Sequence, residues 1–286
     1  MSRKHSVSRV ARAKINLALD VLGSRPDGYH EVRIVMQTVA FGDRITVSAA
    51  PEVSVISSLN LGDNDLCYRA ARSLQEVCGV CDGARIVIEK AVPVAAGMGG
   101  GSSDAAATLL ALRDLWQISA PLQLLQEVAA GLGSDVPFFL HGGTALATGR
   151  GEQIVAVQPP MDRHLVFLAG PHRPLRTGDV YAAVSPSEKD HTGAALAALM
   201  QRERPPLGND LEPAALALMP EIAAFLHDCR RIAGDAAAAV SGSGPTILVL
   251  IPELRAAPPF FELSRRAGFW SQVTVTWQDS LVGGTK

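Results

Sequence analysis

The sequence predicts an α+β fold, because strand-like and helical segments follow one another in an order that does not suit an open parallel sheet. Two observations carry this prediction. The first is an alternating apolar and polar pattern near the N-terminus, and the second is a glycine-rich turn between an apolar run and a helical one. The chain has 286 residues, of which 48% are hydrophobic and 19% charged, enough for two domains with real cores.

The first predicted strand covers residues 7–21. Its apolar side chains fall on one face and most of its polar ones on the other. Lys14 and Asn16 share the polar face and lie about 7 Å apart at the rise of a strand. Residues 25–28 read Arg-Pro-Asp-Gly, which is a turn signal, and Tyr-His follows directly. We expect two further strands after this turn, at residues 31–40 and 44–49.

The remaining elements follow from local periodicity and from end signals. We expect helices at residues 65–77, 104–116, 121–130, 193–201 and 213–227. Strands are expected at residues 84–90, 164–169, 236–240 and 246–251. The apolar segment 138–148 indicates more sheet or a short helix. Pro159 and Pro160 mark the best boundary, which predicts domains of residues 1–159 and 160–286.

Residues 93–103, with the sequence PVAAGMGGGSS, are the most informative motif. Glycines lack Cβ atoms, so a ligand can approach backbone N–H groups, and the following helix adds unpaired donors and a partial positive charge. Two serines are placed to cap that helix. A Rossmann turn would need Gly or Ala where Ser102 stands, and a Walker loop would need G-K-[ST]. We interpret the motif as a phosphate loop of another kind; a flexible surface loop is the alternative.

Three polar residues gain meaning when they are considered with this loop. Alone, Lys14 is typical of a solvated strand charge, His30 of a turn and Asp135 of a helix cap. Phosphoryl transfer to an alcohol needs a phosphate cradle, a cation, a carboxylate near the accepting hydroxyl and a pocket that aligns them. The chain offers all four, the last from the Gly-Tyr-His segment at residues 28–30.

Composition argues against several classes of partner. The net charge of −2 gives no reason to expect nucleic acid or an anionic membrane. The N-terminus lacks the apolar core of a signal peptide, and no stretch of about 18 apolar residues is present, so we expect a cytoplasmic protein. Cys78 and Cys81 have the spacing of a metal or redox pair, but no second pair completes a zinc site. We interpret the cysteines as buried or incidental thiols in a reducing compartment.

Five segments, in order along nearly the whole chain, resemble the GHMP kinase superfamily. They are AKINL with RPDGYHE (13–17 and 25–31), PVAAGMGGGSS (93–103), GSDVP (133–137), NDLEP (209–213) and SGSGPT (241–246). The resemblance implies a two-domain GHMP-kinase fold, with a ribosomal-protein-S5-like N-terminal domain and a ferredoxin-like C-terminal domain. AKIN and PDGYH resemble the members that use ATP to phosphorylate the 2-hydroxyl of 4-diphosphocytidyl-2-C-methyl-D-erythritol in non-mevalonate isoprenoid biosynthesis.

The resemblance also implies roles for single residues. Lys14 and Asp135 match the catalytic pair. The aspartate accepts the hydroxyl proton or orients the hydroxyl, and the lysine keeps the aspartate ionised and stabilises the transferring phosphoryl group. We therefore expect the two side chains at ion-pair distance. Asn16 is expected beside the accepting hydroxyl. Tyr29 and His30 are expected to hold the cytosine by stacking and by hydrogen bonds.

The remaining implied contacts concern ATP, magnesium and the diphosphate. The ATP phosphates are expected on the backbone of Pro93, Val94, Ala95, Ala96, Gly97, Met98, Gly99, Gly100, Gly101, Ser102 and Ser103. Asn64 and Lys90 match positions near the adenine, and Gly242, Ser243 and Gly244 match positions near the substrate's diphosphate. Mg²⁺ is expected because the charge of ATP must be neutralised, with Ser102 or Ser103 as the candidate ligand. The expected partner is the small-molecule substrate, bound by a monomer or homodimer.

Three alternatives remain open at this stage. A homoserine or mevalonate kinase of the same superfamily would keep the glycine loop but would not need Tyr29 and His30 to hold a base. A related ATP-dependent decarboxylase would release phosphate and carbon dioxide. A non-catalytic ATP sensor would bind ATP without depending on Lys14 or Asp135.

Overall fold

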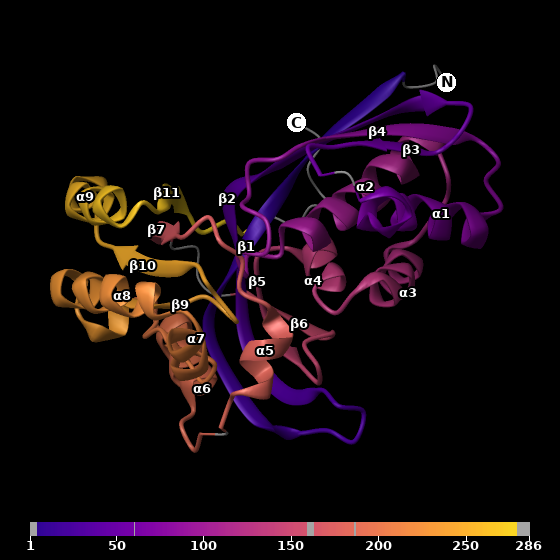
Figure 1. The fold of residues 1–286 in the computed structure, drawn as a ribbon. Helices are drawn as coiled ribbons and strands as arrows, with labels where there is room; N and C mark the ends of the chain where they lie inside the picture. The colour runs from indigo at the N-terminus through magenta and orange to yellow at the C-terminus, as the bar shows by residue number, and fades with distance from the viewer. Residues whose placement is uncertain (1–4, 60, 159–162, 186, 279–286) are drawn as a thin grey trace.

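The larger of the two β-sheets in the described residues organises the first half of the chain (Figure 1). The computed structural model describes residues 5–59, 61–158, 163–185 and 187–278. The strands of this sheet are β1 (Ser6–Ser24), β2 (His30–Ala50), β3 (Ser54–Ile56), β4 (Gly83–Glu89), β5 (Thr144–Thr148), β6 (Gln153–Val157) and β8 (Gly208–Asn209). Their order is β3-β4-β2-β1-β8, and β5 pairs with β2 and β6. β1 and β2 form a long antiparallel hairpin, with Ser24 opposite His30 at the turn.

Helices cover one face of this sheet (Figure 1). They are the short 3₁₀ turn η1 (Gly62–Asn64), α1 (Leu66–Cys78), α2 (Gly100–Trp116), α3 (Leu122–Leu132) and α4 (Val136–His141). α2 lies against β1 and β2 on one side and against the other helices on the other. Every residue from Ser103 to Leu112 is buried, because the small alanines of α2 let its neighbours pack close.

The smaller sheet and its helices form the opposite end of the molecule (Figure 1). Its antiparallel strands, in the order β11-β7-β10-β9, are β7 (Leu165–Gly170), β9 (Ala238–Val240), β10 (Ile247–Ile251) and β11 (Trp270–Val275). The helical elements of the second half of the chain are α5 (Thr177–Ala182), α6 (His191–Met200), α7 (Glu212–Leu218), α8 (Pro220–Ala233), η2 (Asp235–Ala237), η3 (Leu254–Ala256) and α9 (Pro258–Ala267). Of these, α6 packs on β1 and β2 of the larger sheet. No helix in the described ranges is long and apolar enough to cross a membrane.

A shared core joins the two sheets under the glycine-rich loop. Ile15 and Leu17 of β1 belong to one buried cluster with Met98 of the loop and with Leu168 and Leu248 of the smaller sheet. β8 also returns to the larger sheet and pairs with β1 in parallel. The loop is therefore fixed from below by apolar packing, and its upper surface is left for a ligand.

The predicted α+β class is confirmed, and several local expectations need correction. The two strands expected at 31–40 and 44–49 are one strand, β2, which bends along β1 through irregularities in register. The helix expected at 213–227 is interrupted at Met219, and Pro220 begins α8, since proline suits the first turn of a helix but not its interior. The segment 138–148 holds the end of α4 and then β5. The boundary at Pro159 and Pro160 lies outside the described residues, so the domain limits stay a prediction.

The capping of α2 and the polar face of β1 also differ from expectation. α2 begins at Gly100, with Gly99 at its N-cap in a left-handed conformation, so Ser102 and Ser103 belong to its first turn and do not cap it. β1 is buried on both faces from Ala13 to Val21, because the smaller sheet packs on Ile15 and Leu17 while the loops at Gly99 and Gly242 approach Lys14 and Asn16. Lys14 is only 5% exposed as a result.

Candidate functional site

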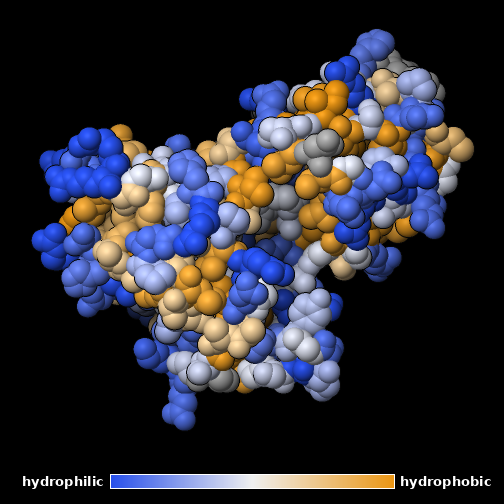
Figure 2. All heavy atoms as spheres, in the orientation of Figure 1, coloured by the Kyte–Doolittle hydropathy of each residue, from blue (hydrophilic) through white to orange (hydrophobic). Residues whose placement is uncertain are grey.

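A cavity of about 770 Å³ lies between the two halves of the molecule. In the space-filling view the surface is hollowed near the middle, with apolar residues on both sides of the hollow (Figure 2). Segments from β1, the β1–β2 turn, the glycine loop, the start of α4 and α5 line it. It includes all the predicted site residues except Ser103 and Gly244. Residues that are far apart in the sequence therefore meet in one site.

Backbone contacts hold the glycine loop against β1 and against the second glycine-rich loop. The carbonyl oxygen of Met98 accepts a hydrogen bond from Lys14 N (3.0 Å). Gly97 has a φ of +73°, and a Cβ atom there would lie 2.7 Å from the carbonyl oxygen of Gly244. Only glycine fits this conformation and this approach without strain. The chain thus presents its backbone to the cavity where phosphates are expected.

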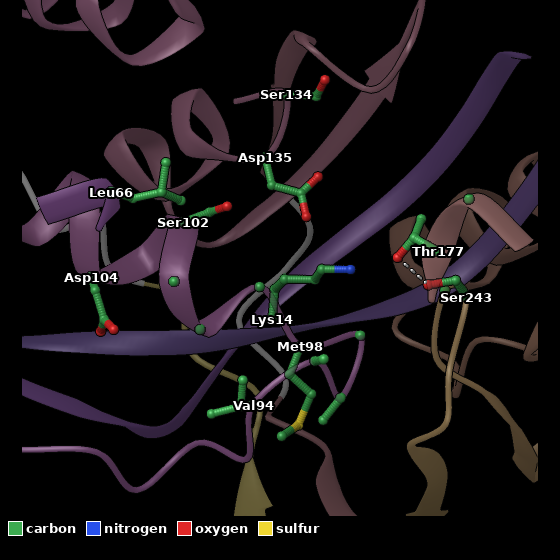
Figure 3. Close-up of a pocket in the computed structure, with 18 of the residues that line it drawn as sticks. Lys14, Leu66, Val94, Met98, Ser102, Asp104, Ser134, Asp135, Thr177 and Ser243 are labelled. Carbon is green, nitrogen blue, oxygen red and sulfur yellow. Dashed lines mark hydrogen bonds between the residues drawn. The ribbon is translucent and has the colours of Figure 1, made fainter. Parts of the chain in front are cut away.

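The two serines of the glycine loop have different environments. Ser103 is fully buried, and its hydroxyl donates to the carbonyl oxygen of Arg12 (2.6 Å). Ser102 lines the cavity, and Figure 3 shows its hydroxyl pointing into it. Of the two candidate magnesium ligands, Ser102 is therefore the one with an oxygen available at the cavity. Within the described ranges, no cluster of three or more His, Cys, Asp or Glu side chains has the arrangement of a metal site.

Lys14 and Asp135 both point into the cavity, from β1 and from the start of α4 (Figure 3). Burial lowers the pKa of Lys14, and the nearby charge of Asp135 partly opposes this. In the described part of the chain no ion pair within 4.0 Å joins the two, so the expected direct contact is absent, while their approach to within about 8 Å stays a prediction. The Lys14 ammonium instead donates to Asn16 Oδ1 (3.1 Å). The two charges are held by different elements, β1 and α4, which leave a gap between them.

The second glycine-rich loop packs against this pair from the side of the smaller sheet. Asn209 Nδ2 donates to the carbonyl oxygens of Val240 (2.9 Å) and Gly242 (2.7 Å), which fixes the loop. A Cβ atom at Gly242 would lie 2.9 Å from Asn16 Nδ2. The Ser243 hydroxyl is 3.0 Å from that of Thr177 at the start of α5 (Figure 3). Gly242 and Ser243 thus face the cavity beside Asn16, whereas Gly244 contacts the first loop.

A buried charge network lies at the foot of the glycine loop. The ammonium of Lys90 donates to Asp43 Oδ2 (2.5 Å) and Asp104 Oδ2 (2.8 Å). The other oxygen of Asp43 accepts from the backbone N–H groups of Ala91 (2.5 Å) and Val92 (2.7 Å). Asp43 thereby binds the residues before the loop to β2, and Lys90 links them to Asp104 of α2. The amino group of Lys90 is therefore engaged by carboxylates, although the residue does line the cavity as expected.

The pKa values in this network follow from burial and from the shared ammonium. Burial, together with the charge of Asp43, raises the pKa of Asp104 to about 7, although Lys90 opposes the shift. For Lys90 burial lowers the pKa, but the two carboxylates outweigh it and the net direction is upward. Nothing in the sequence indicates Asp43, which comes from the middle of β2. For Asp104, the position directly after Ser102 and Ser103 was the only feature of the sequence that could have indicated a place near the site.

Aromatic side chains gather at the end of the cavity near the β1–β2 turn. Tyr29 is 53% exposed, and the guanidinium of Arg150 lies 4.8 Å from the centroid of its ring. The ring of His30 lies 5.3 Å from that of Tyr181 on α5, at an interplanar angle of 35°. Burial, with the charge of Asp135, raises the pKa of Tyr181. Sequence reasoning missed α5 and therefore Tyr181, because the helix is short and carries no periodic apolar pattern.

Asn64 lies across the cavity, on η1, and is exposed. Beside it, Leu61, Leu66 and Val94 give this end an apolar wall. The cavity therefore has an apolar end near η1, a middle lined by the backbone of the glycine loop and an aromatic end near Tyr29. Such a sequence of surfaces suits two ligands that meet at the charged centre.

Comparisons with known proteins agree with this arrangement. The model of the GHMP kinases N terminal domain matches residues 65–143, and that of the GHMP kinases C terminal matches residues 187–262. The chain is 42% identical over 287 residues to the 4-diphosphocytidyl-2-C-methyl-D-erythritol kinase of Pelotomaculum thermopropionicum, covering 96% of this chain and 99% of that protein. It is also 42% identical over 252 residues to the protein of the same name from Bacillus cereus strain AH187, covering 84% and 86%.

Solved structures show the same relationship. A crystal structure of 4-(cytidine 5'-diphospho)-2C-methyl-D-erythritol kinase has a TM-score of 0.80 at 34% identity and covers 95% of this chain and 100% of that one. The homoserine kinase of Cytophaga hutchinsonii has a TM-score of 0.71 at 18% identity and covers 99% and 98%. At that lower identity the likeness concerns the fold alone.

Proposed function

This chain belongs to the GHMP kinase family and, within it, to the 4-diphosphocytidyl-2-C-methyl-D-erythritol kinases, and from this premise we propose its reaction. It transfers the terminal phosphoryl group of ATP to the 2-hydroxyl of 4-diphosphocytidyl-2-C-methyl-D-erythritol, a step of isoprenoid precursor biosynthesis by the non-mevalonate route. The observation that carries the proposal is that Lys14 and Asp135 face one cavity between a glycine-lined backbone and an aromatic end.

ATP occupies the side of the cavity formed by the glycine loop. The loop backbone and the N-terminus of α2 supply N–H donors and a partial positive charge to its phosphates. The adenine lies toward Asn64 and the apolar wall formed by Leu61 and Val94. Lys90 acts here through the shape of the loop, since its ammonium is held by Asp43 and Asp104. The terminal phosphoryl group then lies toward Lys14.

Magnesium accompanies ATP in this proposal. Mg²⁺ is commonly held by one or two protein oxygens together with the phosphates, and it neutralises phosphate charge. The residues present fit such an ion, because the hydroxyl of Ser102 points into the cavity beside the glycine loop. The protein side chains do the remaining work of binding and alignment.

The acceptor hydroxyl enters the gap between Lys14 and Asp135. Its oxygen attacks the terminal phosphorus while the bond from that phosphorus to the bridging oxygen of ADP breaks, and the hydroxyl proton passes to Asp135. The Lys14 ammonium stabilises negative charge on the transferring group, and Asn16 holds Lys14 in place through its amide oxygen. The gap that precludes a direct ion pair is the space this hydroxyl requires.

The cytosine of the substrate binds at the aromatic end. Tyr29 offers an exposed ring for stacking, and the paired rings of His30 and Tyr181 offer a second surface with hydrogen-bonding groups. Such a site has no use in a kinase of small alcohols such as homoserine or mevalonate. We further propose that the enzyme acts in the cytoplasm, as a monomer or homodimer, with the small-molecule substrate as its only required partner.

The proposal is tested by measuring ADP release with magnesium-ATP and three alcohols. The alcohols are 4-diphosphocytidyl-2-C-methyl-D-erythritol, mevalonate and homoserine, each assayed with the wild type and with Asp135→Asn. Turnover with the cytidyl alcohol alone, lost in the variant, is the expected result. Turnover with another alcohol would refute the proposed substrate but would agree with the proposed phosphoryl transfer. Release of carbon dioxide with phosphate would indicate a decarboxylase, and ATP binding without any turnover would indicate a sensor.

A further inference from the structure

Arg150 lies in the turn between β5 and β6, outside the sequence motifs that the other site residues belong to, and lines the same cavity. The turn has a defined shape. Arg150 N donates to Glu152 Oε2 (2.6 Å), and the carbonyl oxygen of Gly149 accepts from Val32 N (2.9 Å). The side chain then reaches over Tyr29, with the guanidinium carbon 4.8 Å from the ring centroid. A fixed backbone therefore presents this cation to the aromatic end of the cavity.

The two lysines of the cavity are already engaged. The ammonium of Lys14 donates to Asn16 at the centre, and that of Lys90 lies between two carboxylates. For the guanidinium of Arg150, the described part of the chain provides no hydrogen bond and no ion pair. Its charge acts on Asp27, but that carboxylate is bound to Arg25 (3.3 Å) and to the backbone N–H of Tyr29 (3.1 Å). Arg150 thus keeps its donors available at the cavity.

These features point to a phosphate group as the ligand of Arg150. A guanidinium is planar, carries five N–H donors and matches two phosphate oxygens at once, while its face can remain stacked on an aromatic ring. In the proposed substrate a diphosphate lies between the cytosine and the alcohol. In the protein, Arg150 adjoins the proposed cytosine site at Tyr29, and the alcohol site lies at Lys14 and Asp135. Gly242 and Ser243 approach the same region from the smaller sheet but bring no charge.

We propose that Arg150 is a substrate-specificity residue that binds the diphosphate of a nucleoside-diphosphate-linked alcohol while it covers one face of Tyr29. This role rests on the proposed function and deepens it. It explains how the site selects a substrate with a diphosphate from small alcohols that lack one, because a guanidinium without an ion pair among the described residues then favours the charged substrate.

The test separates the diphosphate from the base. Binding of cytidine and of cytidine diphosphate is measured by calorimetry for the wild type, Arg150→Met and Arg150→Lys. Methionine keeps an apolar stem without the charge, and lysine keeps the charge without the fork. KM values for ATP and for 4-diphosphocytidyl-2-C-methyl-D-erythritol are measured in parallel. Arg255→Met is the matched control, since Arg255 is exposed, pairs with Glu253 and lies outside the cavity.

The expected result is a loss confined to phosphate-bearing ligands of the substrate side. Arg150→Met weakens cytidine diphosphate binding and raises the substrate KM by about tenfold or more, while cytidine affinity and the ATP KM stay within about twofold. Arg150→Lys recovers part of the loss, and the control changes nothing. Equal losses for cytidine and its diphosphate would overturn the proposal, because Arg150 would then act only by packing on Tyr29.

Other results also overturn it. These are unchanged binding in Arg150→Met, a change in the ATP KM alone, and failure of the wild type to bind cytidine diphosphate. Failure of the proposed function would appear separately, as absence of ADP release by the wild type with the cytidyl alcohol. The comparison of cytidine with cytidine diphosphate does not depend on turnover. It therefore tests the role of Arg150 whether or not the wild type releases ADP with the cytidyl alcohol.

Discussion

Replacement of Asp104 by asparagine tests the electrostatics beneath the glycine loop. Asp104 is 3% exposed, and one carboxylate oxygen accepts from Lys90 at 2.8 Å. Its other oxygen, Oδ1, is buried and finds no hydrogen-bond partner among the described residues. Burial and the charge of Asp43 raise its pKa to about 7, from an ordinary value of 3.8, although Lys90 opposes them. Asparagine has nearly the same shape but does not titrate.

The magnitude follows from proton linkage. Because the folded pKa of Asp104 lies above the unfolded one, the folded protein binds more protons than the unfolded chain between these two values. The stability from this proton is fully present below about pH 4 and is lost as the pH rises through 7. At 1.36 kcal/mol per pKa unit, the shift corresponds to about 4 kcal/mol. The unfolding free energy of Asp104→Asn, relative to the wild type, should therefore rise by about 4 kcal/mol from pH 4 to pH 8.

Urea unfolding, followed by circular dichroism at several values between pH 4 and pH 8, measures this difference. Asp82→Asn is the control, since Asp82 is exposed and distant from the network. Its difference from the wild type should change by less than about 1 kcal/mol over the same range. A flat difference for Asp104→Asn would refute the reasoning, because the carboxylate would then be ionised as it is in water. A difference that falls with rising pH would mean that Lys90 outweighs burial.

Three further predictions concern the proposed catalytic and binding residues. Asp135→Asn should lower kcat by about a thousandfold while ATP affinity, measured by calorimetry, stays unchanged; retained turnover would remove the proton-acceptor role. Tyr29→Ala should raise the KM of the cytidyl substrate by about 5- to 150-fold, equivalent to about 1–3 kcal/mol of stacking. An effect on the ATP KM alone would show that the cytosine does not bind at Tyr29. Gly97→Ala should raise the ATP KM by about tenfold or more, because the added Cβ would force the glycine loop out of shape. The φ of Gly97 is +73°, and the Cβ would lie 2.7 Å from the carbonyl oxygen of Gly244. Gly131→Ala, in open space on α3, is its control and should leave the ATP KM unchanged; equal ATP KM values in the two variants would show that the loop backbone does not hold ATP.

The glycine loop was predictable because its signals are local. Glycines, serines and the start of a helical pattern follow one another within residues 93–103, and the structure has β4 before them and α2 from Gly100. Tyr29 and His30 were likewise predicted as a pair beside a turn signal. Their neighbour Tyr181 was not, since α5 shows no pattern of its own and meets His30 only after the smaller sheet has packed.

Contacts between distant charges were the hardest to predict. Asp43 and Lys90 are 47 positions apart, and their pairing depends on the antiparallel register of β2 and β4. The expected ion pair between Lys14 and Asp135 failed for a related reason. The distance between two side chains depends on how their elements dock, and the residue types of β1 and α4 do not specify that distance.

The sequence by itself therefore determined the α+β class and the glycine-rich turn between a strand and a helix, because each depends on the conformational preferences of neighbouring residues. Only the tertiary structure decided which charge faces which. β1 was expected to carry one solvated face, but the two glycine-rich loops cover Lys14 and Asn16, burial lowers the pKa of Lys14, and its ammonium donates to Asn16. Burial and electrostatic pairing are properties of the packed chain, because they depend on distances and on excluded water that no stretch of sequence contains.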